Sequence, residues 1–404
     1  RHGFIRVSAT SGMHPDVVLV RHGELGVKSE PVRRRMEDRL AENLRAMFDR
    51  RELSGDIERR RNRIVVHADD PAGVTAAAAD TFGVVSASPA VRVEPTLSAI
   101  TDALVAATER RYDDGSFAVD ASRAGPSAAH SFSSTDIESE GGAAVVEAIE
   151  SLGGEPRVDL EDPDFELLAE CRPDDAYVFL EKRAGPGGLP LGTQRPVVAL
   201  ISGGIDSPVA AWKLMARGCP VVPVYVDLGD YGGPDHRARA MATVGTLASY
   251  APGEEMALHV VDAGSVVTAL DAEMGELRML ALRRFMLAAA ESVAESEAAV
   301  GVVTGEAIGQ KSSQTSANLA VTDAATTLPV HRPLLTRDKS AITNLAREIG
   351  TFDDATVDTG CNRVAPDLPE TSASLSAVRA AEPDDLFERA RASAAARSVV
   401  PIER

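Results

Sequence analysis

Lysine, cysteine and long apolar runs are all scarce in this sequence of 404 residues. Only five lysines occur, against 61 acidic residues, and the formal net charge at pH 7 is -19. This composition is typical of a protein from a high-salt cytoplasm, although acidity that only aids solubility is the alternative. No apolar run is long enough to cross a bilayer and no secretory leader is visible, so we expect a cytoplasmic protein without a membrane partner.

The three cysteines, Cys171, Cys219 and Cys361, form neither a CxxC pair nor a zinc-ligand spacing. A disulfide framework is therefore not expected, and each thiol must be judged alone. Cys171 lies in an alternating strand and Cys219 beside a helix stop, which favours buried structural thiols for both. The first residues include no initiator methionine, and we expect Met13 to be the start.

Positive charge is concentrated at the beginning of the chain. Residues 1–63 hold fifteen basic and ten acidic residues, a local net charge of +5. Arg33, Arg34 and Arg35 belong to one helical pattern, and a second cluster occupies residues 59–63. On an acidic protein these clusters predict a surface for a phosphate backbone. The alternative is a solvated helix face balanced by neighbouring acids.

The pattern of apolar residues divides the chain into three folded regions and a linker. Residues 13–80 predict a small α+β domain, and residues 81–182 predict a second domain in which helices alternate with strands. Residues 183–196 are rich in glycine and proline and form the linker. Residues 197–404 show the βα rhythm of a doubly wound parallel sheet, and the stretch 371–398 is expected to be helical. The predicted fold class is therefore a multidomain α/β protein.

The stretch LISGGIDSPVAAW, residues 200–212, combines a strand end, a glycine-rich turn and a helix start. The apolar residues 197–201 predict a buried strand. Ser207 and Pro208 are a suitable N-cap and first helical residue, and Gly218 is a suitable helix stop. Such a turn directs backbone N–H groups and a helix N-terminus at one point, which is an anion site.

The turn differs from a Walker A loop because Asp206 and Ser207 stand where that motif has a lysine. Two adjacent glycines, Gly203 and Gly204, let the backbone approach a pyrophosphate, and the hydroxyls of Ser202 and Ser207 can donate to its oxygens. Asp206 beside phosphates requires a cation, so the pattern implies Mg²⁺ with Asp206 as its ligand. The alternative is a plain tight turn between a strand and a helix.

Several longer stretches resemble one family. The SGGIDS turn resembles the PP-loop of ATP pyrophosphatases, which split ATP between its α and β phosphates. The stretches that resemble the tRNA 4-thiouridine synthetase (tRNA sulfurtransferase) family are VVTGEAIGQKSSQTSANL, LPVHRPLLTRDKSAITNLAREIGT, TGCNRVAPDLPET, RAGPGGLPLGTQ, HSFSSTDIESEGG and VRHGELGVKSEPVRRRMEDRLAENLR. The resemblance implies a ferredoxin-like domain at 13–80, a THUMP RNA-binding domain at 81–182 and a PP-loop domain at 197–404.

The resemblance also implies a reaction with ATP and tRNA. ATP adenylates O4 of a uridine near position 8 of tRNA and releases pyrophosphate, and a cysteine persulfide then delivers sulfur to C4. Cys361 matches the family's sulfur-carrying cysteine, whose alternative is an inert loop thiol. Lys339 matches an important lysine of the PP-loop domain, and its alternative is a surface lysine paired with Asp338. Lys311 is treated as accessory.

The resemblance implies further nucleotide contacts. The residues matched to ATP are Leu200, Ile201, Ser202, Gly203, Gly204, Ser207, Tyr225, Val226, Arg284, Gly305 and Gln314. Leu200, Ile201 and Val226 also suit a sheet core, and both roles are compatible because adenine packs on apolar strand ends. The alternative for Arg284 is an ion pair on the helix surface with an acid such as Glu276.

Two features depart from the family pattern. Bacterial members with a rhodanese domain carry a second active cysteine there, and some archaeal members carry a CxxC pair tied to an iron–sulfur cluster. Neither feature is present before Arg404, so we expect no cluster and no role in thiamine thiazole synthesis. The sulfur donor stays open among sulfide, a cysteine desulfurase and a carrier protein, and the resemblance implies a homodimer. The alternatives are another PP-loop enzyme, and a tRNA-binding protein with an inactive PP-loop.

Overall fold

The computed structural model describes residues 14–23, 29–60, 63–232, 234–355 and 364–402. Contacts divide the chain into two compact units. The first unit holds residues 1–28 and 44–187, and the second holds residues 29–43 and 188–404. Within the described ranges, no helix is long and apolar enough to cross a membrane. Met13 lies outside the described residues.

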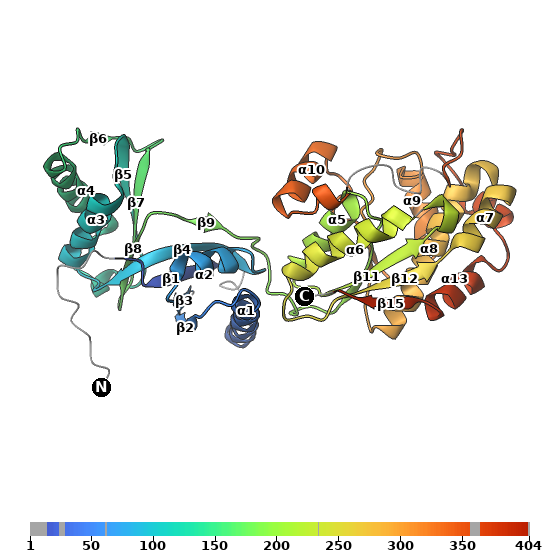
Figure 1. The fold of residues 1–404 in the computed structure, drawn as a ribbon, viewed down its shortest axis with the longest axis horizontal. Coiled ribbons are helices and arrows are strands. Elements are labelled where there is room, and N and C mark those ends of the chain that lie inside the picture. The colour runs from blue at the N-terminus through green and yellow to red at the C-terminus, as the bar shows by residue number, and fades with distance from the viewer. Residues whose placement is uncertain (1–13, 24–28, 61–62, 233, 356–363, 403–404) are drawn as a thin grey trace. The chain divides into compact units, whose positions relative to one another are not determined.

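The first unit is built on one sheet of nine strands (Figure 1). Its strands are β1 (Val17–His22), β2 (Asp56–Arg60), β3 (Arg63–His67), β4 (Val84–Val93), β5 (Ser116–Arg123), β6 (Arg157–Val158), β7 (Phe165–Cys171), β8 (Ala176–Phe179) and β9 (Arg183–Ala184). The order is β2-β3-β1-β4-β8-β7-β5-β6, with β9 paired to β4. All six residues of β1 are buried, as a central strand requires.

Strand β4 joins the two predicted N-terminal domains. It pairs antiparallel with β1 along one edge and antiparallel with β8 along the other. The sheet therefore continues across the predicted boundary between residues 80 and 81. The sequence analysis missed β4 because Ser86, Ser88 and Pro89 interrupt its apolar pattern.

Local capping determines where the helices of the first unit begin. They are α2 (Pro71–Ala79), α3 (Leu97–Arg111) and α4 (Ser134–Ser151), with a short 3-10 turn η2 (Ser127–Ala129). Helix α1 (Glu30–Arg50) has residues in both units. Helix α4 begins at Ser134, because Ser133 and Asp136 form a capping box there. Helices α3 and α4 bury residues such as Leu104 and Ile149 against β5, β7 and β8.

The second unit contains a six-stranded sheet (Figure 1). Its strands are β10 (Val197–Leu200), β11 (Val221–Asp227), β12 (Ala257–Asp262), β13 (Val302–Val303), β14 (Val330–His331) and β15 (Ser398–Pro401). The order is β14-β13-β10-β11-β12-β15, and only β15 runs antiparallel to its neighbour. The predicted doubly wound parallel sheet is confirmed.

Helices pack on this sheet in two groups. The helices are α5 (Asp206–Met215), α6 (Pro234–Ser249), α7 (Gly264–Glu273), α8 (Arg278–Ser296), α9 (Ser316–Asp323), α10 (Lys339–Glu348), α12 (Leu375–Ala381) and α13 (Leu386–Ala395), with 3-10 turns η3 (Gly229–Tyr231), η4 (Gly275–Leu277) and η5 (Asp353–Ala355). Helices α7, α8 and α13 bury one continuous apolar cluster against the strands, centred on Phe285 of α8. Helices α5 and α6 pack on each other and on β11.

One local prediction in this unit is wrong, and another is confirmed in part. Ser207 does not cap α5, because the helix begins at Asp206 and its N-cap, Ile205, makes no side-chain cap bond. The stretch 371–398 is not one helical block: it holds α12 and α13, and Ser398 begins β15. Its alternation of alanine and arginine resembles a helix pattern throughout, but the residues 398–401 complete the sheet edge instead.

A buried ion pair fixes α8 to the C-terminal helices. Arg284 is 0% exposed and donates to both carboxylate oxygens of Glu382, at 2.7 and 3.0 Å. The same guanidinium donates to the carbonyl of Val321 at 2.9 Å and lies over the ring of Phe387. Every direction around this arginine is therefore occupied by protein.

We predict that Glu382→Ala lowers the free energy of unfolding of the second unit by about 3–5 kcal/mol, because it leaves the Arg284 charge buried without its partner. Urea titration followed by fluorescence of Trp212 measures this unit, since that buried residue of α5 is the single tryptophan of the chain. Arg389→Ala, which breaks the exposed pair with Asp385, is the control and should cost less than about 1 kcal/mol. Equal losses in both variants would contradict the prediction.

Candidate active site

A cavity of about 680 Å³ lies at the carboxyl ends of β10, β11 and β13. The order of the sheet reverses at β10, because β11 and β12 follow on one side while β13 and β14 lie on the other. Such a switch point opens a crevice beyond the strand ends, where ligands of doubly wound sheets bind. The residues predicted from sequence that line the cavity are Leu200, Ile201, Ser202, Gly204, Asp206, Ser207, Tyr225, Val226, Gly305, Gln314 and Lys339.

The glycine-rich turn after β10 is held by its own serines. The backbone N–H of Ser202 donates to Oγ of Ser207 at 3.0 Å, and the two hydroxyl oxygens lie 3.2 Å apart. Gly203 has φ +69° and does not line the cavity; a Cβ there would lie 2.9 Å from the carbonyl oxygen of His236. The turn therefore curls back on itself and presents the N-terminus of α5 to the cavity, which favours an anion.

An ion pair crosses the cavity between the first residues of two helices. Nζ of Lys339, which begins α10, donates to Oδ1 of Asp206, which begins α5, at 2.6 Å. The partner is thus Asp206 and not the neighbouring Asp338. A lysine in the first turn opposes the helix dipole, so its position does not serve the stability of α10. Both side chains keep solvent access, at 52% and 30% exposure, and can turn toward a ligand.

Gly305 allows the loop after β13 to approach α5 closely. A Cβ at this position would lie 2.7 Å from the backbone nitrogen of Ser207 and 2.7 Å from the carbonyl carbon of Asp206. Any other residue would displace the start of α5 or the loop itself. The glycine therefore sets the depth of the cavity at the PP-loop turn.

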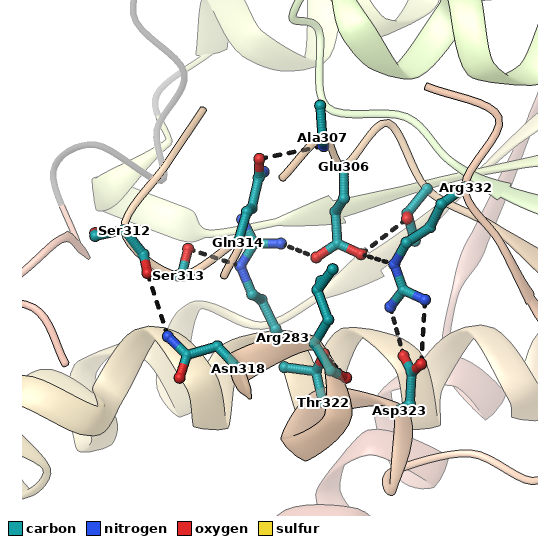
Figure 2. A network of polar contacts seen from close by, with 12 residues as sticks. Arg283, Glu306, Ala307, Ser312, Ser313, Gln314, Asn318, Thr322, Asp323 and Arg332 are labelled. Carbon is teal, nitrogen blue, oxygen red and sulfur yellow. Dashed lines mark hydrogen bonds and ion pairs between the residues drawn. The ribbon is translucent and has the colours of Figure 1, made fainter. Parts of the chain in front are cut away.

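One wall of the cavity is supported by a network of buried charges (Figure 2). Glu306 is buried and accepts hydrogen bonds from Arg283, from Arg332 at 2.7 Å and from the hydroxyl of Thr304 at 2.9 Å. Arg332 also contacts Asp323 of α9, and Arg283 donates to Oγ of Ser313 at 3.1 Å. The network joins the loop after β13 to α8 and α9.

Gln314 completes this wall beside Arg283. The amide nitrogen of Gln314 donates a hydrogen bond to the carbonyl oxygen of Ala307 at 2.8 Å. In this orientation the amide oxygen of Gln314 accepts a hydrogen bond from Nη2 of Arg283 at 3.2 Å. Both side chains line the cavity. These side-chain bonds add to the backbone bonds of the loop, which run from Thr304 to His331 and from Ile308 to Leu335, each at 3.1 Å.

The structure places Arg284 away from the cavity, contrary to the predicted nucleotide contact. It is enclosed by Glu382, Val321 and Phe387 on a different face of α8, and its partner is not the suggested Glu276 either. The arginine of α8 that lines the cavity is Arg283. The sequence analysis missed Arg283 and Glu306.

A helical pattern in the sequence could have identified Arg283. The cavity-lining residues of α8 are Met279, Leu282, Arg283, Met286 and Leu287, which recur at the spacing of one helix face. Arg284 lies outside that face. No comparable signal existed for Glu306, because its arginine partners stand 23 and 26 positions away in the chain.

The remaining wall is apolar. This wall is formed by apolar residues of β11, of the turn after it and of α8. They are Val224, Tyr225, Val226, Leu228, Met279 and Leu282. Apolar surface beside a phosphate-binding turn suits the base of a nucleotide. Among the described residues, no group of three or more histidine, cysteine or acidic side chains could hold a metal ion. Asp206 is the carboxylate available to a cation that also binds phosphates.

Cys361 lies outside the described residues. Ala355 and Ala365, on either side of the segment that contains it, both line the cavity. Lys311 lines the cavity as well. Within the described chain, Cys171 is buried and Cys219 is half-buried, and burial raises the pKa of each thiol.

The two predicted basic clusters differ in their pairing. On α1, Arg34 is 74% exposed and Arg35 is also exposed, whereas Arg33 is 20% exposed and pairs with Glu30 and Glu37. In the second cluster, Arg60 contacts Glu58 at 2.7 Å and Arg63 contacts Glu170 at 2.9 Å. Arg61 lies outside the described residues. Arg60 and Arg63 are thus tied to carboxylates of β2 and β7, whereas Arg59 is exposed like Arg34 and Arg35 of α1.

The charge network around Glu306 should make the stability of the second unit depend on pH. Burial alone would raise the pKa of the Glu306 carboxyl, but Arg283, Arg332 and the hydroxyl of Thr304 hold that pKa below its ordinary value. A lowered pKa gives stability that is present above the ordinary value of 4.5 and lost as the pH falls through the folded-state value. We therefore expect Glu306→Gln to be less stable than wild type at neutral pH, by about 3 kcal/mol.

The difference in stability between wild type and Glu306→Gln should shrink as the pH is lowered below 4.5 and through the folded-state pKa of Glu306, because protonation removes the same charge from the wild type. Urea titrations followed by Trp212 fluorescence at a series of pH values measure this difference in the free energy of unfolding. Glu348→Gln, at an exposed site on α10, should stay within about 0.5 kcal/mol of wild type throughout. A stability gap that does not change with pH would show that the carboxylate charge is not responsible.

Comparison with known families agrees with this architecture. The model of the ThiI ferredoxin-like domain matches residues 17–88, the THUMP domain model matches residues 94–181, and the model described as thiamine biosynthesis protein (ThiI) matches residues 192–386. A crystal structure of a 4-thiouridine synthetase in complex with RNA and bound ATP has a TM-score of 0.80 and 28% identity, covering 96% of this chain and 99% of that one. The fold class predicted from sequence is confirmed.

Curated relatives extend the similarity along nearly the whole chain. A protein named as a probable tRNA sulfurtransferase from Methanosarcina acetivorans is 40% identical over 89% of this chain and 87% of its own length. A protein of the same name from Halobacterium salinarum is 58% identical over 94% of this chain and 96% of its own length. The Halobacterium relative supports the halophilic origin indicated by the acidic, lysine-poor composition. The chain therefore belongs to the tRNA sulfurtransferase family, a family of transferases.

Proposed function

We propose that this protein uses ATP to transfer sulfur to a uridine near position 8 of tRNA, giving 4-thiouridine. The ion pair between Lys339 and Asp206, at two helix starts above the PP-loop turn, is the observation that supports this assignment most directly. It places one cation and one carboxylate where a triphosphate would meet the N-terminus of α5. The solved 4-thiouridine synthetase with RNA and ATP supports both substrates.

The residues that line the cavity favour one orientation of ATP. The base packs between the apolar ends of β10 and β11 and the cavity face of α8, with backbone contacts from Leu200, Ile201 and Val226. The phosphates then reach the turn at Ser202–Ser207, where N–H groups and the α5 dipole favour negative charge. Arg283, rather than Arg284, takes the role of the arginine that contacts the nucleotide.

The first chemical step is adenylation of the uridine. O4 attacks the α-phosphorus, the bond from that phosphorus to the bridging oxygen of the β-phosphate breaks, and pyrophosphate leaves while the N3 proton passes to solvent. Lys339 stabilises charge that develops on the phosphates. Asp206 would hold Mg²⁺ together with phosphate oxygens, which is the usual ligand set of that ion, and the ion would neutralise the phosphates.

The second step replaces oxygen by sulfur. The terminal sulfur of a persulfide on Cys361 attacks C4, and the C4–O bond to AMP breaks. A second thiol then attacks Sγ of Cys361, releases 4-thiouridine and forms a disulfide with Cys361, which an external reductant must reopen. The sulfur donor that reloads the cysteine is sulfide, a desulfurase or a carrier protein, and a homodimer stays a prediction.

The test is mass spectrometry of nucleosides from the tRNA of a deletion strain complemented with wild type, Cys361→Ser or Asp206→Asn. We expect 4-thiouridine only with wild type, because the serine variant carries no sulfur and the asparagine variant forms no adenylate. With purified proteins, Cys361→Ser should still release pyrophosphate in the presence of tRNA, whereas Asp206→Asn should not. Survival of 4-thiouridine in the deletion strain would point to a different PP-loop substrate or an inactive PP-loop.

We also predict that replacing Arg33, Arg34 and Arg35 by alanine weakens tRNA binding and leaves ATP binding unchanged. The slope of log affinity against log salt should become shallower by about one for each tRNA phosphate that an arginine no longer neutralises. Arg34→Ala alone should weaken binding more than Arg33→Ala, because Arg33 is already paired with two glutamates. Fluorescence anisotropy with labelled tRNA at several salt concentrations measures both, and unchanged tRNA affinity in the triple variant would refute this role for α1.

A further inference from the structure

Glu306 follows Gly305 in the loop after β13 and lies between two arginines (Figure 2). One of its carboxylate oxygens, Oε1, accepts a hydrogen bond from Nη1 of Arg283 on α8. The other, Oε2, accepts from Nε of Arg332 at 2.7 Å and from the hydroxyl of Thr304 at 2.9 Å. The side chain of Glu306 is only 8% exposed, so its charge has to be stabilised by these donors.

Arg332 has a second partner, which leaves Glu306 as the carboxylate that serves Arg283. The two terminal nitrogens of Arg332 lie 3.2 and 2.5 Å from the two carboxylate oxygens of Asp323 on α9. Two arginines and two acids therefore balance in charge. The contacts run from Asp323 through Arg332 and Glu306 to Arg283, and they end at the cavity, because Arg283 lines it and Arg332 does not.

The plane of the Arg283 guanidinium is fixed by side chains of one loop. Its Nε donates to Oγ of Ser313 at 3.1 Å, and its Nη2 donates to the amide oxygen of Gln314 at 3.2 Å. Its Nη1 donates to Glu306. These bonds use one N–H group on each nitrogen, whereas an arginine has five such groups. The second N–H groups of Nη1 and Nη2 therefore have fixed directions at the cavity wall.

We propose that Glu306 is a positioning residue for ATP, which holds Arg283 in the orientation that meets the nucleotide, while Arg332 holds Glu306. The inference rests on the proposed function, in which Arg283 contacts ATP. Coulomb's law alone gives the opposite expectation, because a carboxylate in the wall of a triphosphate site repels the ligand. Such a carboxylate is useful there because it orients a donor that the ligand needs.

The substitution Glu306→Gln disturbs the contact with Arg283 selectively. The side-chain oxygen of glutamine can accept from Arg332 and Thr304, the two donors that meet Oε2 in the wild type. The NH2 group of glutamine then takes the place of Oε1 and presents donors to Arg283, which is itself only a donor. The guanidinium must turn away from the amide, and its directions at the cavity wall change.

The test is a double-mutant cycle in the full chain, measured by isothermal titration calorimetry with ATP and magnesium chloride. We expect Glu306→Gln to weaken ATP binding about 10-fold, as the loss of one hydrogen bond to a charged group allows. Arg283→Met keeps the apolar stem and should weaken binding roughly 10- to 100-fold. In the Arg283→Met background, Glu306→Gln should change the Kd by less than about 2-fold, because no guanidinium is left to position.

Two further variants control for charge and for folding. Glu348→Gln removes the same charge from an exposed site on α10 and should bind ATP as wild type does. Ser313→Ala removes the bond to Nε of Arg283 without changing a charge, and it replaces Glu306→Gln in the cycle if that variant does not fold. It should weaken ATP binding about 3-fold, with no further loss in the Arg283→Met background.

Urea titration followed by Trp212 fluorescence shows which variants are folded. A folded Glu306→Gln variant that binds ATP as tightly as wild type, or more tightly, would overturn the positioning role, because simple repulsion would then describe the carboxylate. Equal losses in the wild-type and Arg283→Met backgrounds would overturn it as well. In both cases the proposed function stands. Wild type that binds no ATP would overturn both.

Discussion

Strands β11 and β13 lie on opposite sides of β10, and all three run parallel. This reversal is the constraint on which the site depends, because chain segments leaving the three strands must part in opposite directions and cannot fill the space between them. The glycine-rich turn after β10, the apolar end of β11 and the loop after β13 therefore face one cavity, although they are spread over residues 201 to 314 of the chain. Gly305 then decides how closely two of these segments can approach.

Charge within the second unit is arranged according to exposure. The buried arginines Arg284 and Arg332 are paired with Glu382 and Glu306, whereas the pair at the cavity, Lys339 and Asp206, keeps contact with solvent. High salt screens exposed charges strongly and buried pairs much less. At high salt the buried pairs would therefore continue to hold α8 and the cavity wall, whereas the exposed pair of Lys339 and Asp206 would be weakened.

The sequence predicted the sheet and the turn well because both depend on local signals. Short β-branched runs predicted the central strands, and SGGIDS predicted the turn and its aspartate.

The failures have a common cause in tertiary contacts. Ser207 suits an N-cap, but its hydroxyl oxygen accepts from Ser202 within the turn. Arg284 and Arg283 are adjacent in sequence, and only the phase of α8 against the sheet decides which one meets the cavity. The network around Glu306 could not be predicted at all, because nothing in the sequence distinguishes a buried glutamate from one on the surface. Its partners, Arg283 of α8 and Arg332 just after β14, come to lie beside it only in the folded chain. Strand β4 was missed for a related reason: its serines and proline make a poor strand by propensity, yet pairing with β1 and β8 on both edges outweighs that preference.

The proposed reaction has two steps with different geometric needs, and the fold supplies them from different parts. Adenylation needs phosphates held still, and the groups for it begin helices or end strands, which are rigid. Sulfur transfer needs a cysteine that meets a donor and then C4, so it cannot be fixed in one rigid element. The cavity accordingly combines this rigid phosphate site with Ala355 and Ala365, which are the residues of its lining that lie nearest to Cys361 in sequence.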